Sequence, residues 1–475
     1  MTSEDTGDGD EADGQRPTDG TETGGAAAVR LDGPETLLAD ERARPRATGV
    51  PDGTTVVVDL TATDHTGQTW RASRRYRPVD GAVDLAAHDP VDADETDPSP
   101  AGLAWALAPV DGDPVRFPTA PHGDHERRYR AVVRDEAGRE VATATTTTTV
   151  VHERGVTHRH VGGGEDADDG DEPSERSGRS DGGAGTSGPS ETPVEPPTGH
   201  CYSPTGDGPH PAVVLCHGSG GVPLRRHAAL LASRGYVAFA LQYLGVDDLP
   251  ETPVEVPLSV PRRAVRWLRA HPATTGSVGL YGVSMGGQLA ALLASEPDVS
   301  VDAVVVDSGS LHVFPAGGDT APWTRDGEPV ATTAVPDAPP DRFASSTGGA
   351  SDRRTAFHAM VAATDRERRR AATISAEQIR TPVLWLSGTD DATWPATAAG
   401  EALLARCDAR DVTFPVDHRV YHDAGHAFGP PGLPTTWRPA GPDDRVARGG
   451  TPGAHAAGRQ TAWAATRTWF DDALR

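Results

Sequence analysis

Hydrophobic and polar positions form different patterns in successive parts of the chain. Residues 1–28 are mainly acidic residues, glycine and threonine with little to bury, which predicts a disordered acidic tail. Residues 29–161 carry short runs in which apolar and polar positions alternate, as in β-strands with one buried face. Residues 162–199 are acidic and rich in glycine, serine and proline, so we expect a flexible linker between two domains. From residue 200 to 475, apolar runs of strand length alternate with stretches of helical periodicity.

Two hairpins are predicted within residues 29–161. The stretches Thr54–Asp64 and Gln68–Arg77 flank a turn that contains glycine, and so do Tyr129–Asp135 and Arg139–Val151. Short strands without an amphipathic helix between them favour an all-β sandwich domain of immunoglobulin-like size. Because no catalytic pattern occurs here, a packing or substrate-framing role is favoured over a separate binding module.

The region 200–475 is predicted to fold as a mostly parallel sheet flanked by helices. Its expected strands lie within 211–217, 235–243, 278–281, 301–309, 381–391 and 418–423, and its expected helices within 224–234, 261–272, 285–294, 397–407 and 455–474. Residues 310–372 break this alternation, so we expect them to form an excursion over the strand ends.

The motif Gly282-Val283-Ser284-Met285-Gly286 stands between a predicted strand and a predicted helix. A nucleophile elbow requires this strand–turn–helix context, with small residues two positions before and after the nucleophile. The turn lifts the hydroxyl of Ser284 above the sheet, and the following helix N-terminus favours negative charge there. The sequence therefore predicts an α/β-hydrolase catalytic domain with Ser284 as its nucleophile.

A serine nucleophile needs a base and an orienting acid, which follow it in the order acid, then histidine in this fold. His426 is the expected base, because small residues before it let its loop reach back over the elbow; His422 is the alternative, within or beside a strand. Asp391, at the end of a predicted strand, is the expected acid. Asp390 and Asp307 remain alternative acids, the first by adjacency and the second at the end of the preceding strand.

The oxyanion of an acyl-transfer intermediate needs two backbone donors. One is expected to be the amide of Met285, next to the nucleophile, and the other the amide of Ser219 or Gly220 in the loop His217–Gly221. Cys216 is expected to pack in its strand rather than to act as a second nucleophile. No metal-binding or cofactor motif occurs, so neither is expected.

Charge and cysteine content narrow the partners and the location. The net charge is −25 and every basic residue is arginine, which argues against nucleic acid or an anionic membrane as a partner. An acid excess without lysine predicts adaptation to high salt, as in a halophilic archaeon; a GC-rich genome is the alternative. Three cysteines without C-x-x-C spacing, no signal peptide and no apolar run of about 18 residues predict a soluble, cytoplasmic protein.

With these residues in place, the chain resembles the family of acyl-CoA thioesterases and bile acid-CoA:amino acid N-acyltransferases. The resemblance is carried by HAALLASRGYVAFALQYLGVDDLP (227–250), EVPLSVPRRAVRWLRAHP (255–272), GLYGVSMGGQLAALLAS (279–295), TPVLWLSGTDDATWP (381–395) and YHDAGHAFGPP (421–431). It implies an immunoglobulin-like domain followed by an α/β-hydrolase domain, with Ser284 as nucleophile, Asp391 as acid and His426 as base. Family members usually have phenylalanine or leucine where this chain has His217.

Serine at the elbow is typical of the family members that hydrolyse the thioester, whereas cysteine is typical of those that transfer the acyl group to an amino acid. The expected function is therefore hydrolysis of acyl-CoA thioesters to free acid and CoA through an acyl-enzyme. The alternatives are a carboxylesterase or dienelactone-type hydrolase acting on oxygen esters, an acyl-CoA:amino acid N-acyltransferase, and a non-catalytic binding protein that retains the fold. No pattern in 310–372 indicates an acyl chain length.

Overall fold

The structure is a computed structural model that describes residues 29–32, 35–41, 46–64, 66–85, 87–88, 90–91, 103–111, 126–149, 155–162, 194–336, 353–436 and 447–475. The predicted acidic tail, residues 163–193 of the predicted linker and residues 337–352 of the excursion lie outside these ranges.

The N-terminal part, which we call the β unit, consists of two sheets around one core. Six strands pair in the order β2-β9-β8-β4-β5-β7, and β1, β3 and β6 form a second sheet. The strands are β1 (Arg30–Asp32), β2 (Thr36–Leu38), β3 (Arg46–Thr48), β4 (Val56–Thr63), β5 (Thr69–Tyr76), β6 (Ala82–Asp84), β7 (Ala108–Pro109), β8 (Glu126–Arg134) and β9 (Glu140–Thr149). Both predicted hairpins, β4–β5 and β8–β9, are confirmed as antiparallel pairs. Trp70 and Val133 of the larger sheet share a core with Ala47 of the smaller one.

The C-terminal part, which we call the α/β unit, is built on an eight-stranded sheet of order β10-β11-β13-β12-β15-β16-β19-β20. Its strands are β10 (Val156–Val161), β11 (Gly199–Pro204), β12 (His210–Cys216), β13 (Val237–Leu241), β15 (Thr274–Val283), β16 (Ala303–Asp307), β19 (Val383–Gly388) and β20 (Val416–Tyr421). From β13 to β20 all pairs are parallel, as predicted. The carboxyl ends of these strands therefore meet at one edge of the sheet, where α/β folds carry their sites.

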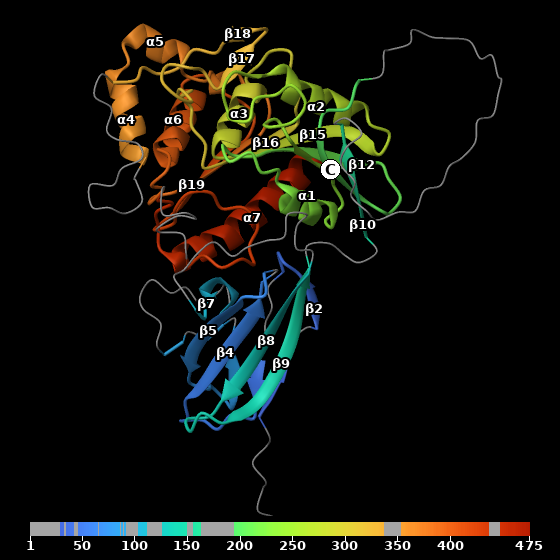
Figure 1. Cartoon of the computed structure of the whole chain (residues 1–475), viewed down its shortest axis with the longest axis vertical. Coiled ribbons are helices and arrows are strands. Elements are labelled where there is room, and N and C mark those ends of the chain that lie inside the picture. The colour runs from blue at the N-terminus through green and yellow to red at the C-terminus, as the bar shows by residue number, and fades with distance from the viewer. Residues whose placement is uncertain are drawn as a thin grey trace, which may run out of the picture.

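Helices cover both faces of this sheet (Figure 1). They are α1 (Arg225–Ala232), α2 (Ser259–Ala270), α3 (Met285–Ala294), α6 (Ala396–Asp408) and α7 (Pro452–Leu474). Successive residues of β12 point to opposite faces of the sheet. Val213 packs in the core formed with α1 and α7, whereas Val214 packs in the core formed with α2, α3 and α6. No helix in the described part of the chain combines the length and apolar character needed to cross a bilayer.

The described parts of the excursion between β16 and β19 contain short strands and helices. They are β17 (Trp323–Arg325), β18 (Glu328–Pro329), α4 (Arg353–Ala363), α5 (Arg366–Ala371) and the 3₁₀ helix η3 (Ala376–Gln378). Strand β14 (Val256–Pro257), from the segment before α2, pairs with β17 and completes a small sheet.

Strand β10 belongs to the large sheet of the α/β unit and not to the sheets of the β unit. The sequence placed residues up to 161 in the sandwich, but β10 pairs antiparallel with β11 at the edge of the large sheet. Val161 faces Gly199, so the residues at the two ends of the predicted linker are neighbours in one sheet. The partner strands are separated by the long acidic stretch, and no short turn signal marked them as a hairpin.

A buried carboxylate joins the two units. Asp40, which follows β2, accepts hydrogen bonds from Arg234 at 2.6 Å, Arg467 at 2.9 Å and the indole Nε1 of Trp463 at 3.1 Å. Burial alone would raise the pKa of Asp40, but the hydrogen bonds and charges of its partners outweigh it and lower that pKa. Arg467 and Trp463 lie on α7. This helix lies next to the β unit (Figure 1). The cluster around Asp40 therefore holds the two units together.

Candidate active site

Ser284 lies at a sharp turn between β15 and α3. Its φ of 57° and ψ of −122° are unusual for an L-residue and store backbone strain. A Cβ on Gly282 would lie 2.0 Å from the carbonyl oxygen of Gly286, and a Cβ on Gly286 would lie 2.2 Å from that of Cys216. Only glycine fits at either position. The Ser284 amide donates to the carbonyl of Asp307 at 2.8 Å, which fastens the turn to the neighbouring strand.

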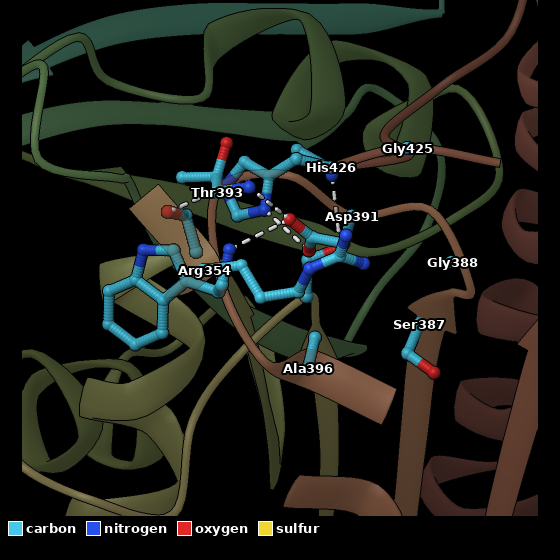
Figure 2. A network of polar contacts seen from close by, with 12 residues as sticks. Arg354, Ser387, Gly388, Asp391, Thr393, Ala396, Gly425 and His426 are labelled. Carbon is cyan, nitrogen blue, oxygen red and sulfur yellow. Dashed lines mark hydrogen bonds and ion pairs between the residues drawn. The ribbon is translucent and has the colours of Figure 1, made fainter. Parts of the chain in front are cut away.

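A continuous hydrogen-bonded chain joins Ser284, His426 and Asp391. The Oγ of Ser284 lies 2.8 Å from Nε2 of His426, and Nδ1 of His426 lies 2.8 Å from Oδ2 of Asp391. Figure 2 shows Asp391 at the centre of its contacts: its Oδ1 also accepts the amides of Thr393 and Trp394, each at 2.8 Å. Since a carboxylate only accepts hydrogen bonds, Nδ1 carries the ring proton and Nε2 accepts the serine hydroxyl.

The alternatives left open by the sequence differ in their surroundings. His422 and Asp390 are both exposed, whereas His426 and Asp391 are almost fully buried. The structure therefore brings His426, and not His422, to the hydroxyl of Ser284, and Asp391, and not Asp390, to the ring of His426.

Asp307 is also buried, but it faces the backbone beyond His426 instead of its ring. Its carboxylate accepts the amides of Phe428 and Gly429 at 3.0 Å and the hydroxyl of Tyr281 at 2.8 Å. The next residue, Ser308, donates its hydroxyl to Asp307 at 3.0 Å and accepts the amide of Ala427 at 3.0 Å. The end of β16 therefore holds the three residues that follow His426.

The loop after β12 approaches the nucleophile through Gly218. A Cβ on Gly218 would lie 3.5 Å from Cβ of Ser284, while Ser219 and Gly220 are exposed. The carbonyl of Gly218 accepts Nδ1 of His217 at 2.7 Å and the amide of Gly221 at 3.3 Å. Burial lowers the pKa of His217 to about 4, so its ring is neutral and donates through Nδ1. The ring stacks on Tyr243 at 3.8 Å between centroids, and the Tyr243 hydroxyl donates to the carbonyl of His217.

Sequence reasoning missed three residues that shape the site. Asp307 was considered only as a triad acid, and His217 only as part of a glycine loop. The third is His455 on α7, whose Nδ1 accepts the amide of Gly425 at 3.2 Å and whose ring stacks on Phe428. The position of Asp307 at a strand end was a usable signal, but nothing in the local sequence indicates what His455 contacts.

Other described features contribute nothing to this site. In the part of the chain that the structure describes, no three His, Cys, Asp or Glu side chains are arranged to hold a metal ion. A cavity of about 1020 Å³ lies beside the C-terminal end of α3, and no residue of the hydrogen-bonded chain lines it. In that cavity Glu296 is occupied by ion pairs of 2.6 Å with both Arg262 and Arg325.

Both units match known families. The profile described as "Acyl-CoA thioester hydrolase/BAAT N-terminal region" matches residues 40–162, and the profile "BAAT / Acyl-CoA thioester hydrolase C terminal" matches residues 256–475. The two profiles describe the two parts of one family, and together they cover most of the chain.

Curated relatives agree with this assignment. Rat mitochondrial acyl-coenzyme A thioesterase 2 is 27% identical over 419 residues, which are 86% of this chain and 82% of that protein. Mouse acyl-coenzyme A thioesterase 5 is 29% identical over 274 residues, and human acyl-coenzyme A thioesterase 1 is 29% identical over 278 residues. In the mouse and human comparisons the match covers 57% of this chain and only 61% and 62% of the relatives' own lengths.

Solved structures similar to this chain include an esterase from Pyrococcus furiosus, at 13% identity and a TM-score of 0.35, covering 59% of this chain and 87% of that one. Dienelactone hydrolase from Anabaena variabilis is similar at 19% identity and a TM-score of 0.32, covering 58% of this chain and 92% of that one. The fold follows from the strand order and elbow described above, and the family follows from the two profile matches. The chain belongs to the acyl-CoA thioester hydrolase/bile acid-CoA:amino acid N-acyltransferase family.

Proposed function

We propose that this chain is a serine hydrolase that cleaves acyl-CoA thioesters to free acid and CoA. The observation that carries the proposal is the chain of two 2.8 Å hydrogen bonds from Ser284 through His426 to Asp391, in a member of this family. The similar curated proteins are acyl-coenzyme A thioesterases, and the thioester substrate is inferred from them.

In the first half-reaction, Oγ of Ser284 attacks the thioester carbonyl carbon while its proton passes to Nε2 of His426. Asp391 holds the resulting imidazolium through Nδ1. The tetrahedral intermediate then expels the thiolate of CoA, which takes the proton from His426 and leaves an ester on Ser284.

In the second half-reaction, water attacks this ester while His426 accepts one of its protons. The bond between the acyl carbon and Oγ breaks, and His426 returns the proton to Ser284. No cofactor enters this balance.

Two backbone amides are proposed as the oxyanion hole. The amide of Met285 is the first of α3 and has no partner within its helix. The second is the amide of Ser219, with Gly220 as the alternative. Supporting Ser219, the preceding carbonyl of Gly218 is held by His217 and Gly221, which fixes the Gly218–Ser219 peptide next to Ser284. Because N–H and C=O point in opposite directions across a trans peptide, the Ser219 amide is held ready to donate.

Thiol release tests the proposal directly. Free CoA would be measured with a thiol reagent for acyl-CoAs of several chain lengths at high KCl, beside p-nitrophenyl esters, for wild type and Ser284→Ala. Thioester cleavage that exceeds ester cleavage and disappears in the variant is the expected result. Ser300→Ala, which removes an exposed hydroxyl outside the hydrogen-bonded chain of Ser284, serves as the matched control.

The oxygen-ester hydrolase is the second candidate, favoured by the loop that begins with His217-Gly218, which is common in ordinary esterases. Ester cleavage without thiol release would establish it. An acyl-amino acid product in the presence of glycine or taurine would indicate an N-acyltransferase instead. Absence of any turnover in the wild type, together with failure of Ser284 to react with a fluorophosphonate, would identify a non-catalytic binding protein.

Two further proposals concern organisation and location. We place the functional division after β9, with residues 29–149 as the β unit and the α/β unit starting at β10, because of the β10–β11 pairing. We also propose a cytoplasmic location, which is supported by three buried cysteines without disulfide partners.

A further inference from the structure

A short segment after the catalytic histidine lies between the two units. We call residues 430–436 the strap; it follows His426 by only four positions. In the described part of the chain, polar contacts reach the strap from the α/β unit and from the β unit.

On the α/β side, arginines hold the first carbonyl groups of the strap. Arg226 of α1 donates to the carbonyl of Pro431 at 2.8 Å. Arg459 of α7 donates to the carbonyls of Pro430 and Leu433. These contacts fix one side of the strap against helices that cover the sheet.

On the other side, the β unit supplies three hydrogen bonds. Tyr129 of β8 donates its hydroxyl to the carbonyl of Gly432 at 3.3 Å. The carbonyls of Trp105 and Leu107 accept the amide of Thr435 at 3.0 Å and the hydroxyl of Thr436 at 2.9 Å. The side chain of Leu433 also packs against the core of the β unit.

Gly432 is a point of close approach between the strap and the β unit. Its φ is +86°, and a Cβ there would lie 2.8 Å from the carbonyl oxygen of Ala39 in the β unit. A side chain at this position would force the strap and the β unit apart. The β unit cannot easily move in response, because the buried Asp40 cluster anchors it to α1's C-terminal end and α7.

The strap continues directly into the backbone that positions the base. Phe428 is fully buried, contacts the rings of Tyr421 and His455, and shares the carboxylate of Asp307 with Gly429. Ala427 has a φ of 64°, so the turn next to His426 is held in a conformation unfavourable for its sequence. The strap begins one residue after Gly429, so a displacement of the strap would act directly on this turn.

We propose that the β unit completes the active site by seating the strap, and that Tyr129 and Gly432 are thereby positioning residues for His426. This inference rests on the triad of the proposed function. It does not require acyl-CoA to be the substrate, since positioning of the base affects every reaction of Ser284.

The test uses the full-length chain and the reaction of Ser284 with a fluorophosphonate, which needs the base but no CoA. The variant is Gly432→Ala. Its matched control is Gly53→Ala in the β unit, where φ is +81° and a Cβ would meet nothing within 4 Å. Both substitutions place alanine in the left-handed region, but only Gly432→Ala pushes on the strap.

We expect Gly432→Ala to slow labelling and to lower kcat by about tenfold relative to Gly53→Ala, because small misplacements of catalytic groups are costly. KM should change by less than about twofold, since no substrate contact is removed. The final labelled fraction should stay the same in both variants. A merely structural role would instead lower that fraction and leave the rate constant unchanged, and this result would overturn the proposal.

A double variant tests the proposal independently, in case Gly432→Ala does not fold. The double variant Tyr129→Phe/Thr436→Val keeps the shapes of both side chains and removes two of the three hydrogen bonds from the β unit. It should slow labelling by about threefold, and its melting temperature should fall by only a few degrees because each lost hydrogen bond contributes about 1 kcal/mol. Equal rates for this variant and wild type would also contradict the proposal. Failure of the wild type to react would instead refute the triad.

Discussion

The nucleophile and the base of this site are positioned in different ways. Ser284 is placed by its own neighbours: a strand before it, a helix after it and two glycines that no other residue can replace. His426 is placed by residues from across the fold, namely Asp391 after β19, Asp307 at the end of β16 and His455 on α7. The nucleophile is therefore positioned mainly by local chain geometry, with a tertiary hydrogen bond from its amide to the carbonyl of Asp307, whereas the base depends on side chains from several distant elements.

The largest expected effect comes from removing the locally positioned group. Ser284→Ala should lower kcat by about 10⁴–10⁶-fold, as expected for loss of a triad nucleophile. Its melting temperature should not fall, since the substitution removes only an oxygen at a strained turn. Residual turnover above about 1% of wild type would show that another residue is the nucleophile.

Asp307→Asn tests the remote support of the base. In the variant, an amide NH2 group would replace one of the carboxylate oxygens that accept hydrogen bonds from the backbone N–H groups of Phe428 and Gly429. A buried hydrogen-bond donor would then face other donors, which is unfavourable. We expect kcat to fall by about 10²-fold, since the base is displaced without being removed.

The matched control for Asp307→Asn is Asp390→Asn, which makes the same change at an exposed carboxylate and should alter kcat by less than about twofold. Equal kcat values for the two variants would mean that the contacts of Asp307 do not position His426.

The stability that the contact between the two units provides should depend on pH, because it involves the carboxylate of Asp40. Its pKa is lower in the folded protein than the unfolded value of about 3.9, so its stabilising contribution is present above that pH. The contribution is lost as the pH falls through the folded-state pKa. Asp40→Asn should reduce the free energy of unfolding by about 2 kcal/mol at pH 7.

Denaturant unfolding of wild type and Asp40→Asn at several pH values measures this contribution. The difference in unfolding free energy between the two proteins should narrow below about pH 4, where the Asp40 carboxylate is protonated in the unfolded chain while it is still ionised in the folded protein. A difference that is constant from pH 7 to pH 3 would show that the charge of Asp40 is not what joins the units.

The smallest expected effect concerns the oxyanion loop. His217→Phe retains an aromatic ring against Tyr243 but removes the hydrogen bond to the carbonyl of Gly218. We expect kcat to fall by about tenfold with KM unchanged, less than the 10²–10³-fold loss typical when an oxyanion donor itself is removed. Unchanged kcat would mean that Gly221 alone holds this peptide.

The features that the sequence predicted are those set by local chain geometry, and the features that it missed depend on tertiary contacts. The elbow, the alternation of strands and helices and both hairpins are encoded in short stretches, so periodicity and glycine positions were enough to predict them. The assignment of β10 and the roles of Asp307 and His455 depend on partners that are distant along the chain. Asp390 and Asp391 are adjacent in sequence, and only the course of the loop after β19 buries one and exposes the other.

The pairing of β10 with β11 also bears on how this chain tolerates changes in length. Val161 and Gly199 are cross-strand partners, and a Cβ on Gly162 would lie within 3 Å of Thr198. The segment between them has no distance to span, so insertions and deletions there leave the paired ends where they are. The same property makes it a natural place to splice in an affinity tag or a fluorescent reporter without disturbing the triad.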